Sequence, residues 1–235
     1  MPERPVYADA ADAVADVPNG ATVMIGGFAG VGIPLTLVRA LSKRELRGLT
    51  TVSNGTTHGP DPDLPGGVPP ARQVARAICS FPVRASVNLE DEFEQSYENG
   101  SVILEIVPQG TLAERIRAGG SGIAAFYTPT GVGTPFAEGK EAREIDGRVC
   151  VLEHGLRADF ALIKAFKADT MGNLIYRNTM RNFNPIMASA AEVTIAEVDE
   201  VVPVGALDPE AVITPGIYVH RIVVAKRAAD DRRRR

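Results

Sequence analysis

The sequence predicts an α/β fold, an open, mainly parallel sheet with helices on both faces. Short apolar runs of strand length alternate with segments whose apolar residues have helical spacing, and that alternation is typical of a parallel sheet covered on both sides. The clearest unit is Asn19–Pro34, in which apolar Val23–Ile25 leads into a loop with four glycines and then to a proline. Because proline is favoured in the first turn of a helix, this unit is predicted to be strand, glycine-rich turn and helix.

The other elements follow from the same two periodicities. Helices are expected at Ala8–Val17, directly after Pro34, and at Glu90–Tyr97, Thr111–Gly119 and Asn184–Ala191. Further strands are expected at Leu49–Ser53, Val74–Phe81, Val102–Val107, Ala158–Phe166, Val193–Val198 and Ile217–Val224. Val102–Val107 is apolar almost throughout, which predicts burial on both faces.

Turn residues set the connections between these elements. Asp146-Gly147 is a strong turn signal and predicts a hairpin within Ile145–Leu152, after a charged loop at Gly131–Arg143. The five prolines of Pro60–Pro70 exclude a long helix, so an extended surface loop is expected there. Residues 1–227 are predicted to form a single domain, and residues 228–235 a charged, disordered C-terminal tail.

Composition excludes several classes of function. The formal net charge of -4 gives no reason to expect a nucleic-acid partner. The sequence has neither a membrane-spanning apolar run nor a signal peptide, so a cytoplasmic protein is expected. Cys79 and Cys150 lie in apolar runs and are predicted to be reduced core thiols. The three histidines, His58, His154 and His220, lack metal-ligand spacing, so no metal site is predicted.

The glycine-rich loop is the first candidate site. Glycines allow a backbone to approach a ligand closely, and the helix that follows offers free N–H groups to an anion. The loop has neither the dinucleotide fingerprint nor the lysine of a Walker loop. The alternative is a glycine turn that only packs helix on strand. The residues concerned are Gly26, Gly27, Phe28, Ala29, Gly30, Val31 and Gly32.

Two amide side chains are further candidates. Gln109 follows the predicted strand Val102–Val107, and Asn54 follows Leu49–Ser53. Ligands of open α/β sheets bind in the crevice at the carboxyl ends of the strands. The Gln109 amide can donate to a carbonyl or an oxyanion there. Asn54 either donates to a substrate or caps a turn.

The stretch Asn19–Pro34 resembles the motif of the A half of family I CoA-transferases. The motif is Asn/Asp-Gly, two residues, three apolar residues, Gly-Gly-Phe, three residues, Gly, one residue and Pro, and the sequence matches it position by position. The block around Gln109, residues 158–185 and ITPGIYVHRIV near the end are similar to the same A subunits. The resemblance covers most of the chain and implies the CoA-transferase, sugar-isomerase-like superfold.

This resemblance implies half of an enzyme. Family I enzymes move CoA between carboxylic acids through a glutamyl-CoA thioester, and the nucleophilic glutamate lies in the B half. A B subunit is therefore expected as partner, in an α2β2 tetramer, with CoA thioester as substrate and no permanently bound cofactor. The glycine loop would contact CoA, and Gln109 would hold the thioester carbonyl. The resemblance favours succinyl-CoA as donor and 3-oxoadipate over acetoacetate as acceptor. Pro60–Pro70 stands where relatives have a short helix, so the acceptor acid can differ from both 3-oxoadipate and acetoacetate.

Several residues are set aside or left open. Glu98-Asn99-Gly100 looks like the nucleophile motif, but its flanks do not fit, and a helix-to-strand turn is expected instead. Arg115 and Arg117 are expected to be solvated on an exposed helix, and His58 to be an exposed loop residue. Arg177 and Arg181 meet either an acidic substrate or a subunit interface. A CoA-thioester hydrolase and a non-catalytic binding module of the same superfold stay open as rival classes.

Overall fold

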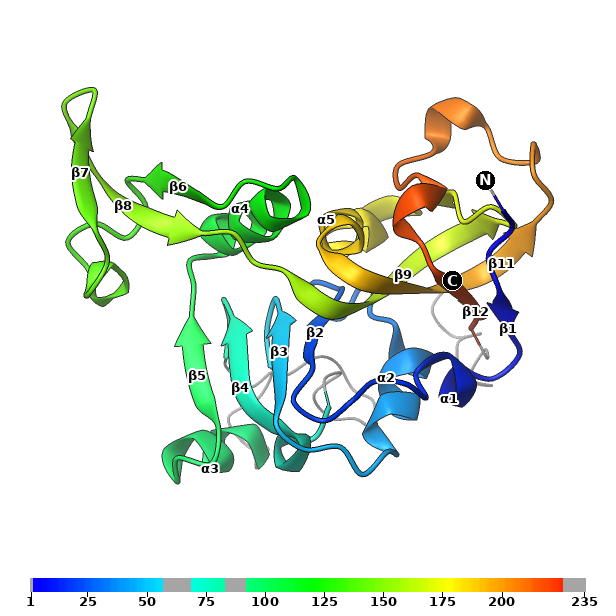
Figure 1. The fold of residues 1–235 in the computed structure, drawn as a ribbon, viewed down its shortest axis with the longest axis horizontal. Helices are drawn as coiled ribbons and strands as arrows, with labels where there is room; N and C mark the ends of the chain where they lie inside the picture. The colour runs from blue at the N-terminus through cyan, green and yellow to red at the C-terminus, as the bar shows by residue number, and fades with distance from the viewer. Residues whose placement is uncertain (1, 57–68, 83–91, 226–235) are drawn as a thin grey trace.

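The computed structural model describes residues 2–56, 69–82 and 92–225. Its main layer is a nine-stranded sheet in the order β1-β12-β11-β9-β2-β3-β4-β5 (Figure 1). Neighbours along this order are parallel, and β10 adds to β9 as an antiparallel strand. The strands are β1 (Val6–Tyr7), β2 (Thr22–Ile25), β3 (Leu49–Ser53), β4 (Val74–Cys79), β5 (Ile103–Ile106), β9 (Ala158–Asp169), β10 (Leu174–Ile175), β11 (Ala191–Val202) and β12 (Arg221–Val224).

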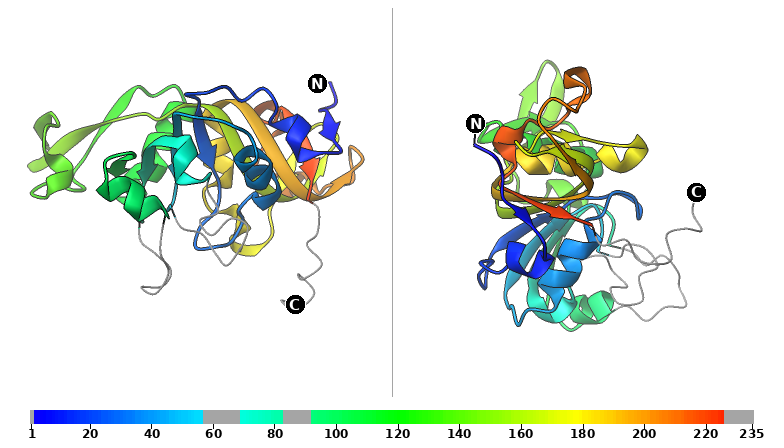
Figure 2. Two further views of the ribbon diagram at one scale, coloured as in Figure 1. Left: turned by 90° about the horizontal axis from the view of Figure 1, so that it is seen from below. Right: turned by 90° about the vertical axis from the view of Figure 1, so that its right-hand side faces the viewer.

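Helices cover both faces of this sheet, as the sequence predicts. Helices α4 and α5 pack on one face and α1 and α2 on the other (Figures 1 and 2). Helix α3 lies near the amino end of β5. The helices are α1 (Ala10–Ala13), α2 (Leu35–Ser42), α3 (Glu92–Glu98), α4 (Gln109–Gly120) and α5 (Asn184–Ser189), with 3-10 turns at Ala71–Gln73, Pro135–Ala137, Asn178–Arg181, Pro209–Ala211 and Gly216–Tyr218.

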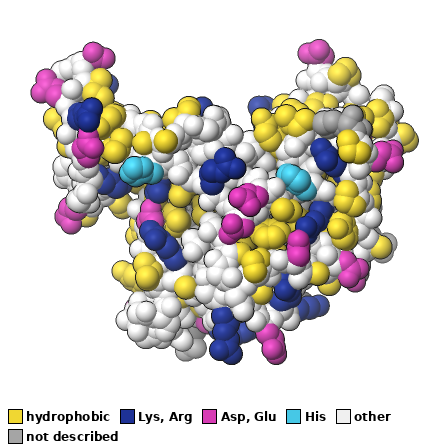
Figure 3. Space-filling view, in the orientation of Figure 1, with side chains coloured by type: hydrophobic (Ala, Val, Ile, Leu, Met, Phe, Trp, Pro, Cys, Tyr) yellow, Lys and Arg dark blue, Asp and Glu magenta, His cyan; other side chains and the backbone are white. Residues whose placement is uncertain are grey.

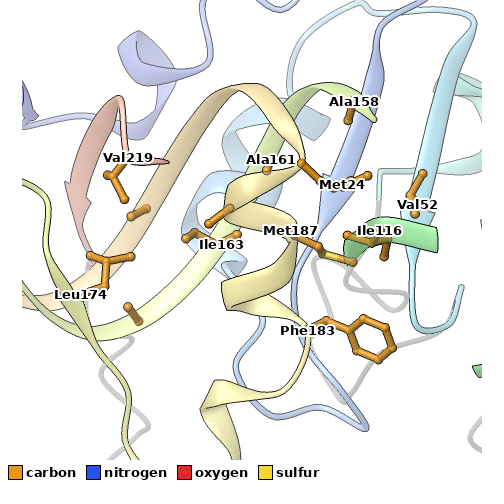
Figure 4. Packing of buried hydrophobic residues seen from close by; sticks show 14 of the residues in the cluster. Met24, Val52, Ile116, Ala158, Ala161, Ile163, Leu174, Phe183, Met187 and Val219 are labelled. Atoms are coloured by element: carbon orange, nitrogen blue, oxygen red, sulfur yellow. The ribbon is translucent and has the colours of Figure 1, made fainter. Parts of the chain in front are cut away.

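Strand β9 organises the core because its side chains alternate between the two faces. Ala161 and Ile163 join the cluster under α4 and α5, whereas Phe160 and Leu162 join the cluster over α1 and α2. In the first cluster Met187 of α5 lies among side chains from the sheet and from α4 (Figure 4). The predicted strand at this position is therefore confirmed, and it extends to Asp169.

A second, three-stranded antiparallel sheet projects from the body. It is formed by β6 (Ala125–Thr128), β7 (Ala142–Ile145) and β8 (Arg148–His154), in the order β6-β8-β7. The predicted hairpin is confirmed, and Asp146 and Gly147 both have positive φ, at 51° and 71°. The sequence patterns do not predict β6, and β7 begins inside the stretch expected to be a loop. We call residues 121–154 the arm (Figures 1 and 2).

The prediction that Val102–Val107 is buried on both faces is wrong. The strand is only Ile103–Ile106 and forms the edge of the main sheet. Ile103 is 64% exposed and Ile106 is 40% exposed. Val102 and Val107, which flank the strand, are buried instead. A continuous apolar run therefore marks an edge strand between two buried anchors.

Two other elements are shorter in the structure than the sequence predicts. The α-helix predicted at Ala8–Val17 ends at Ala13, because Val14 already leaves the helical region. Val14 and Val17 are both fully buried. The strand predicted at Ile217–Val224 begins only at Arg221, after a 3-10 turn. His58, most of Pro60–Pro70 and the predicted tail 228–235 lie outside the described residues.

Candidate functional site

The glycine loop leaves the sheet at the carboxyl end of β2 and folds into a tight turn. Gly26 continues the strand, since its N–H donates to the Leu162 carbonyl at 2.9 Å. Phe28 and Val31 then exchange two backbone hydrogen bonds, of 3.0 and 2.9 Å. Ala29 and Gly30, at the tip, both have positive φ, of 47° and 84°. The turn is thus rigidly hydrogen-bonded at its base, and Phe28 is half-exposed.

The helix start behind the loop is already occupied, which corrects one expectation. The backbone N–H groups of Thr36 and Leu37 both donate to the Glu197 carboxylate, at 2.8 and 3.2 Å. Glu197 is buried, and burial raises the pKa of its carboxyl although Lys164 and the two amides act in the opposite direction. These N–H groups are therefore not free to bind an external anion.

The two candidate amides meet each other. Gln109 is the first residue of α4, and its Nε2 donates to Asn54 Oδ1 at 2.6 Å. Asn54 is buried, and its backbone carbonyl accepts from the backbone N–H groups of Ser80 and Phe81. Its side chain does not cap its own turn among the described contacts. Instead it orients Gln109 across the carboxyl ends of β3 and β5.

A pocket of about 300 Å³ lies beside Gln109. Its described lining comes from three places in the sequence, namely the glycine loop, the start of α4 and the start of α5. Apolar groups dominate the lining, and the two polar side chains are both uncharged amides. The lining residues are Phe28, Gln109, Gly110, Ala113, Asn182, Phe183 and Ile186. The pocket thus suits a neutral chain with a carbonyl rather than a free phosphate.

Sequence reasoning misses the contribution of the α5 start. Asn182 Nδ2 donates to the Val31 carbonyl at 3.1 Å and so touches the glycine loop directly. Asn184 is fully buried and donates to the Gly32 carbonyl at 3.0 Å. The run Asn182-Phe183-Asn184-Pro185 predicts only a helix start. Two asparagines around an apolar residue before a helix proline are the signal available, and it does not indicate the loop about 150 residues away.

None of the four arginines singled out in the sequence is among the described residues that line the pocket. Arg115, expected to be solvated, is buried and donates to Glu105 at 2.7 Å and to the His154 carbonyl at 2.9 Å. It therefore joins α4 to β5 and the arm. Arg117 is exposed as expected and pairs with Glu114. Arg177 precedes the 3-10 turn Asn178–Arg181 and Arg181 ends it, and both side chains are exposed.

Glu98 lies away from the pocket. It is the exposed last residue of α3, at the amino end of β5, whereas Gln109 follows the carboxyl end of the same strand (Figure 1). In the described ranges, no three His, Cys, Asp or Glu side chains are grouped to hold a metal ion. Over the same ranges, no helix has the length and apolar character needed to cross a membrane.

Comparison with known proteins gives the following relatives. A family model described as coenzyme A transferase matches residues 7–225. The A subunit of 3-oxoadipate CoA-transferase from Pseudomonas putida is 51% identical over 95% of this chain and 94% of its own. The A subunit of succinyl-CoA:3-ketoacid coenzyme A transferase from Xanthomonas campestris pv. campestris (strain B100) is also 51% identical, over 93% of this chain and 88% of its own.

Solved structures share the fold. An acyl-CoA transferase from Escherichia coli O157:H7, in a thioester complex with CoA, superposes with a TM-score of 0.79 at 22% identity. The match covers 95% of this chain and 50% of that one, so this chain spans half its length. Glutaconate coenzyme A-transferase from Acidaminococcus fermentans also gives 0.79, at 20% identity, over 94% and 75%. At these identities the likeness bears on the fold alone.

Proposed function

The chain belongs to the coenzyme A transferase family, and we propose that it is the A subunit of an enzyme that moves CoA from succinyl-CoA to a 3-oxoacid. We favour 3-oxoadipate over acetoacetate as the acceptor. The partner is a B subunit, in an α2β2 assembly in the cytoplasm. CoA thioester is a substrate, and no other cofactor is proposed. The observation that carries this proposal is the contact between Gln109 and Asn54 beside a pocket whose described lining residues carry no charge.

Gln109 is assigned to the reacting carbonyl. One N–H of its amide is held by Asn54 at 2.6 Å, so the second points in a fixed direction from the start of α4. A donor that is oriented before reaction stabilises the oxyanion of a tetrahedral intermediate without reorganising. Asn54 is assigned to hold that amide and to border the acid substrate.

The glycine loop is assigned to the uncharged part of the CoA thioester. Glu197 already takes the N–H groups of Thr36 and Leu37, so the start of α2 offers no site for a CoA phosphate. Phe28 lines the pocket from the loop, and Phe183 lines it from the position just before α5. These contacts support a subsite for the thioester end of the pantetheine arm.

The nucleophile is assigned to a glutamate of the B subunit. None of the described lining residues is a carboxylate, and Glu98 lies at the other end of β5. The glutamate attacks the thioester and displaces CoA thiolate, which leaves an acyl-glutamyl anhydride. The thiolate then attacks the glutamyl carbonyl and releases the acid, which gives glutamyl-CoA. The acceptor acid then attacks glutamyl-CoA, and the same two steps run in reverse to give the CoA thioester of the acceptor and the free glutamate.

The proposal predicts that Gln109→Ala removes most of the activity. The chain is co-expressed with its B-type partner, and CoA transfer from succinyl-CoA is assayed with 3-oxoadipate and with acetoacetate. Loss of one oxyanion donor is expected to lower kcat by about 10²–10³-fold. Gln95→Ala is the matched control, because Gln95 is exposed on α3, and it should retain full activity.

The same assay tests the alternatives. A preference for acetoacetate would replace the favoured acceptor, and the two relatives at 51% identity do not separate these acids. Release of free CoA without any acceptor acid would favour a hydrolase. Activity in the chain alone that is lost in Glu98→Gln would contradict the assignment of the nucleophile to the B subunit.

A further inference from the structure

We propose that Asn184 is a positioning residue that packs against both ends of the glycine loop and ties its Gly32 end to α5, and this proposal rests on the loop's role in the proposed function. Asn184 is fully buried at the first position of α5 and touches no solvent. Its neighbours Phe183 and Ile186 line the pocket. The residue thus stands between the loop and the opposite wall of the same pocket.

The amide group of Asn184 is fully used in this position. Its Oδ1 accepts from the backbone N–H of Lys164, in the middle of β9, at 2.9 Å. Its Nδ2 donates to the carbonyls of Gly32, at 3.0 Å, and of Met180, at 2.8 Å. One acceptor and two donors on one short side chain are the properties of an asparagine amide. Aspartate supplies the acceptor but turns oxygen toward the other two carbonyls.

Two glycines of the loop lie directly against this amide. A Cβ at Gly26 would lie 1.8 Å from Asn184 Oδ1, far closer than two atoms that are not bonded to each other can approach. A Cβ at Gly32 would lie 3.1 Å from Asn184 Nδ2 and 2.9 Å from the Met180 carbonyl oxygen. These glycines are therefore required by the close approach of Asn184 as well as by any ligand. The first and last glycines of the loop meet at one side chain.

The consequence for the site is mechanical. The turn that carries Phe28 lies between the two anchored glycines, and Asn182 adds a bond to Val31. Loss of the Asn184 amide removes the hydrogen bond that holds the Gly32 end of the loop, while Gly26 keeps its own bond to Leu162 and α2 is held separately by Glu197. Phe28 then no longer keeps a fixed distance from Gln109 across the pocket.

The test uses Asn184→Asp in the complex with the B subunit. The KM for the CoA thioester should rise about tenfold, because aspartate cannot donate to the Gly32 carbonyl and the loop loses that hydrogen bond, with a smaller change in kcat. Met187→Ala is the matched control, because Met187 is fully buried in the same helix and packs in the core. It should lower thermal stability and leave KM unchanged. Equal KM effects in both variants would overturn the proposal.

Two further readouts do not depend on activity. Amide hydrogen exchange over residues 26–32 should rise in Asn184→Asp and not in Met187→Ala, and unchanged exchange would overturn the positioning role. Gly26→Ala should prevent stable folding, whereas Gly26→Ala with Asn184→Ala should be as stable as Asn184→Ala alone. No rescue in the double variant would contradict the proposed contact. Failure of the wild-type complex to transfer CoA would reject the proposed function and leave these results interpretable.

Discussion

Single glycines in this protein differ sharply in what surrounds them. In α4, an added Cβ at Gly119 would lie 1.9 Å from the Leu156 carbonyl oxygen, whereas one at Gly110 meets nothing within 4 Å. The two residues occur in the same helix. Helix propensity alone therefore gives the same expectation for both, and only the tertiary contact separates them.

We predict opposite effects of alanine at these two glycines. Gly110→Ala should raise the free energy of unfolding by about 0.5–1 kcal/mol, because alanine loses less backbone entropy in a helix. Gly119→Ala should lower it, because the backbone at Leu156 must move away. Urea unfolding of both variants measures the difference. A stabilising Gly119→Ala would show that α4 and the chain at Leu156 can separate at no cost.

The site residues show which part of a site a sequence can reveal. Gln109 and Asn54 are predictable as candidates because each follows a strand of a parallel sheet. Their direct contact is not, since it depends on the strand order, in which β4 alone separates β3 from β5. Asn184 carries no local pattern of its own. Its role depends on a loop far away in the chain, so periodicity and spacing do not report it.

Edges of elements are where sequence patterns and structure diverge most. Strand β5 has an apolar sequence and yet lies at the edge of the main sheet. Apolar character alone therefore does not distinguish a central strand from an edge strand. Glu105 of this strand is held by Arg115 and Arg76. Burial would raise the pKa of Glu105, but the two arginines outweigh it and lower the pKa. Charge pairing thus takes the place of packing at this edge.

The link between the chain after α1 and β12 is predicted to be pH-dependent. Arg221 donates to both oxygens of Asp16 at 2.6 Å, and this contact lowers the pKa of Asp16 below its usual value although slight burial opposes it. A carboxyl with a lowered folded-state pKa adds stability above its unfolded pKa, and that stability is lost as pH falls through the folded value. Asp16 is 55% exposed, so the contribution is small.

Asp16→Asn should lower the free energy of unfolding at pH 7 by about 0.2–1 kcal/mol. The difference from wild type should shrink as the pH is lowered from 7 toward 3, which urea titrations at several pH values can follow. Glu192→Gln serves as control, because Glu192 is exposed on β11 and forms no ion pair among the described residues. A pH-independent effect of Asp16→Asn would argue against the charge contribution.

The molecule as a whole divides into a packed body and an arm that stays outside the apolar clusters of that body. Within the described ranges, the three apolar clusters include no residue from 121–154. Space-filling shows the arm standing clear of the body at upper left, with charged side chains along it (Figure 3). Arg115 and the ion pair between Lys140 and Glu153 fix its base.

We predict that the arm tolerates change at its tip and not at its base. Val149 is 50% exposed and Val151 is 2% exposed, although both lie on β8. Val149→Thr should change the free energy of unfolding by less than about 0.5 kcal/mol. Val151→Thr keeps the side-chain volume but buries a hydroxyl in place of a methyl group, and it should lower the free energy of unfolding by about 1–3 kcal/mol. Thermal unfolding distinguishes the two, and a cost at Val149 as large as that at Val151 would mean that the arm is packed along its whole length.

Because β9 lies in the middle of the sheet but late in the sequence, the sheet cannot be completed until late in synthesis. Strand β2 pairs with β3 on one side and with β9 on the other. Strand β9 is synthesised about 110 residues after β3, which takes about 5–20 s at a translation rate of roughly 5–20 residues per second. Throughout that interval an open strand edge is available to neighbouring nascent chains. Yield of soluble protein should therefore depend on translation speed and chaperone supply, even where the finished molecule is stable.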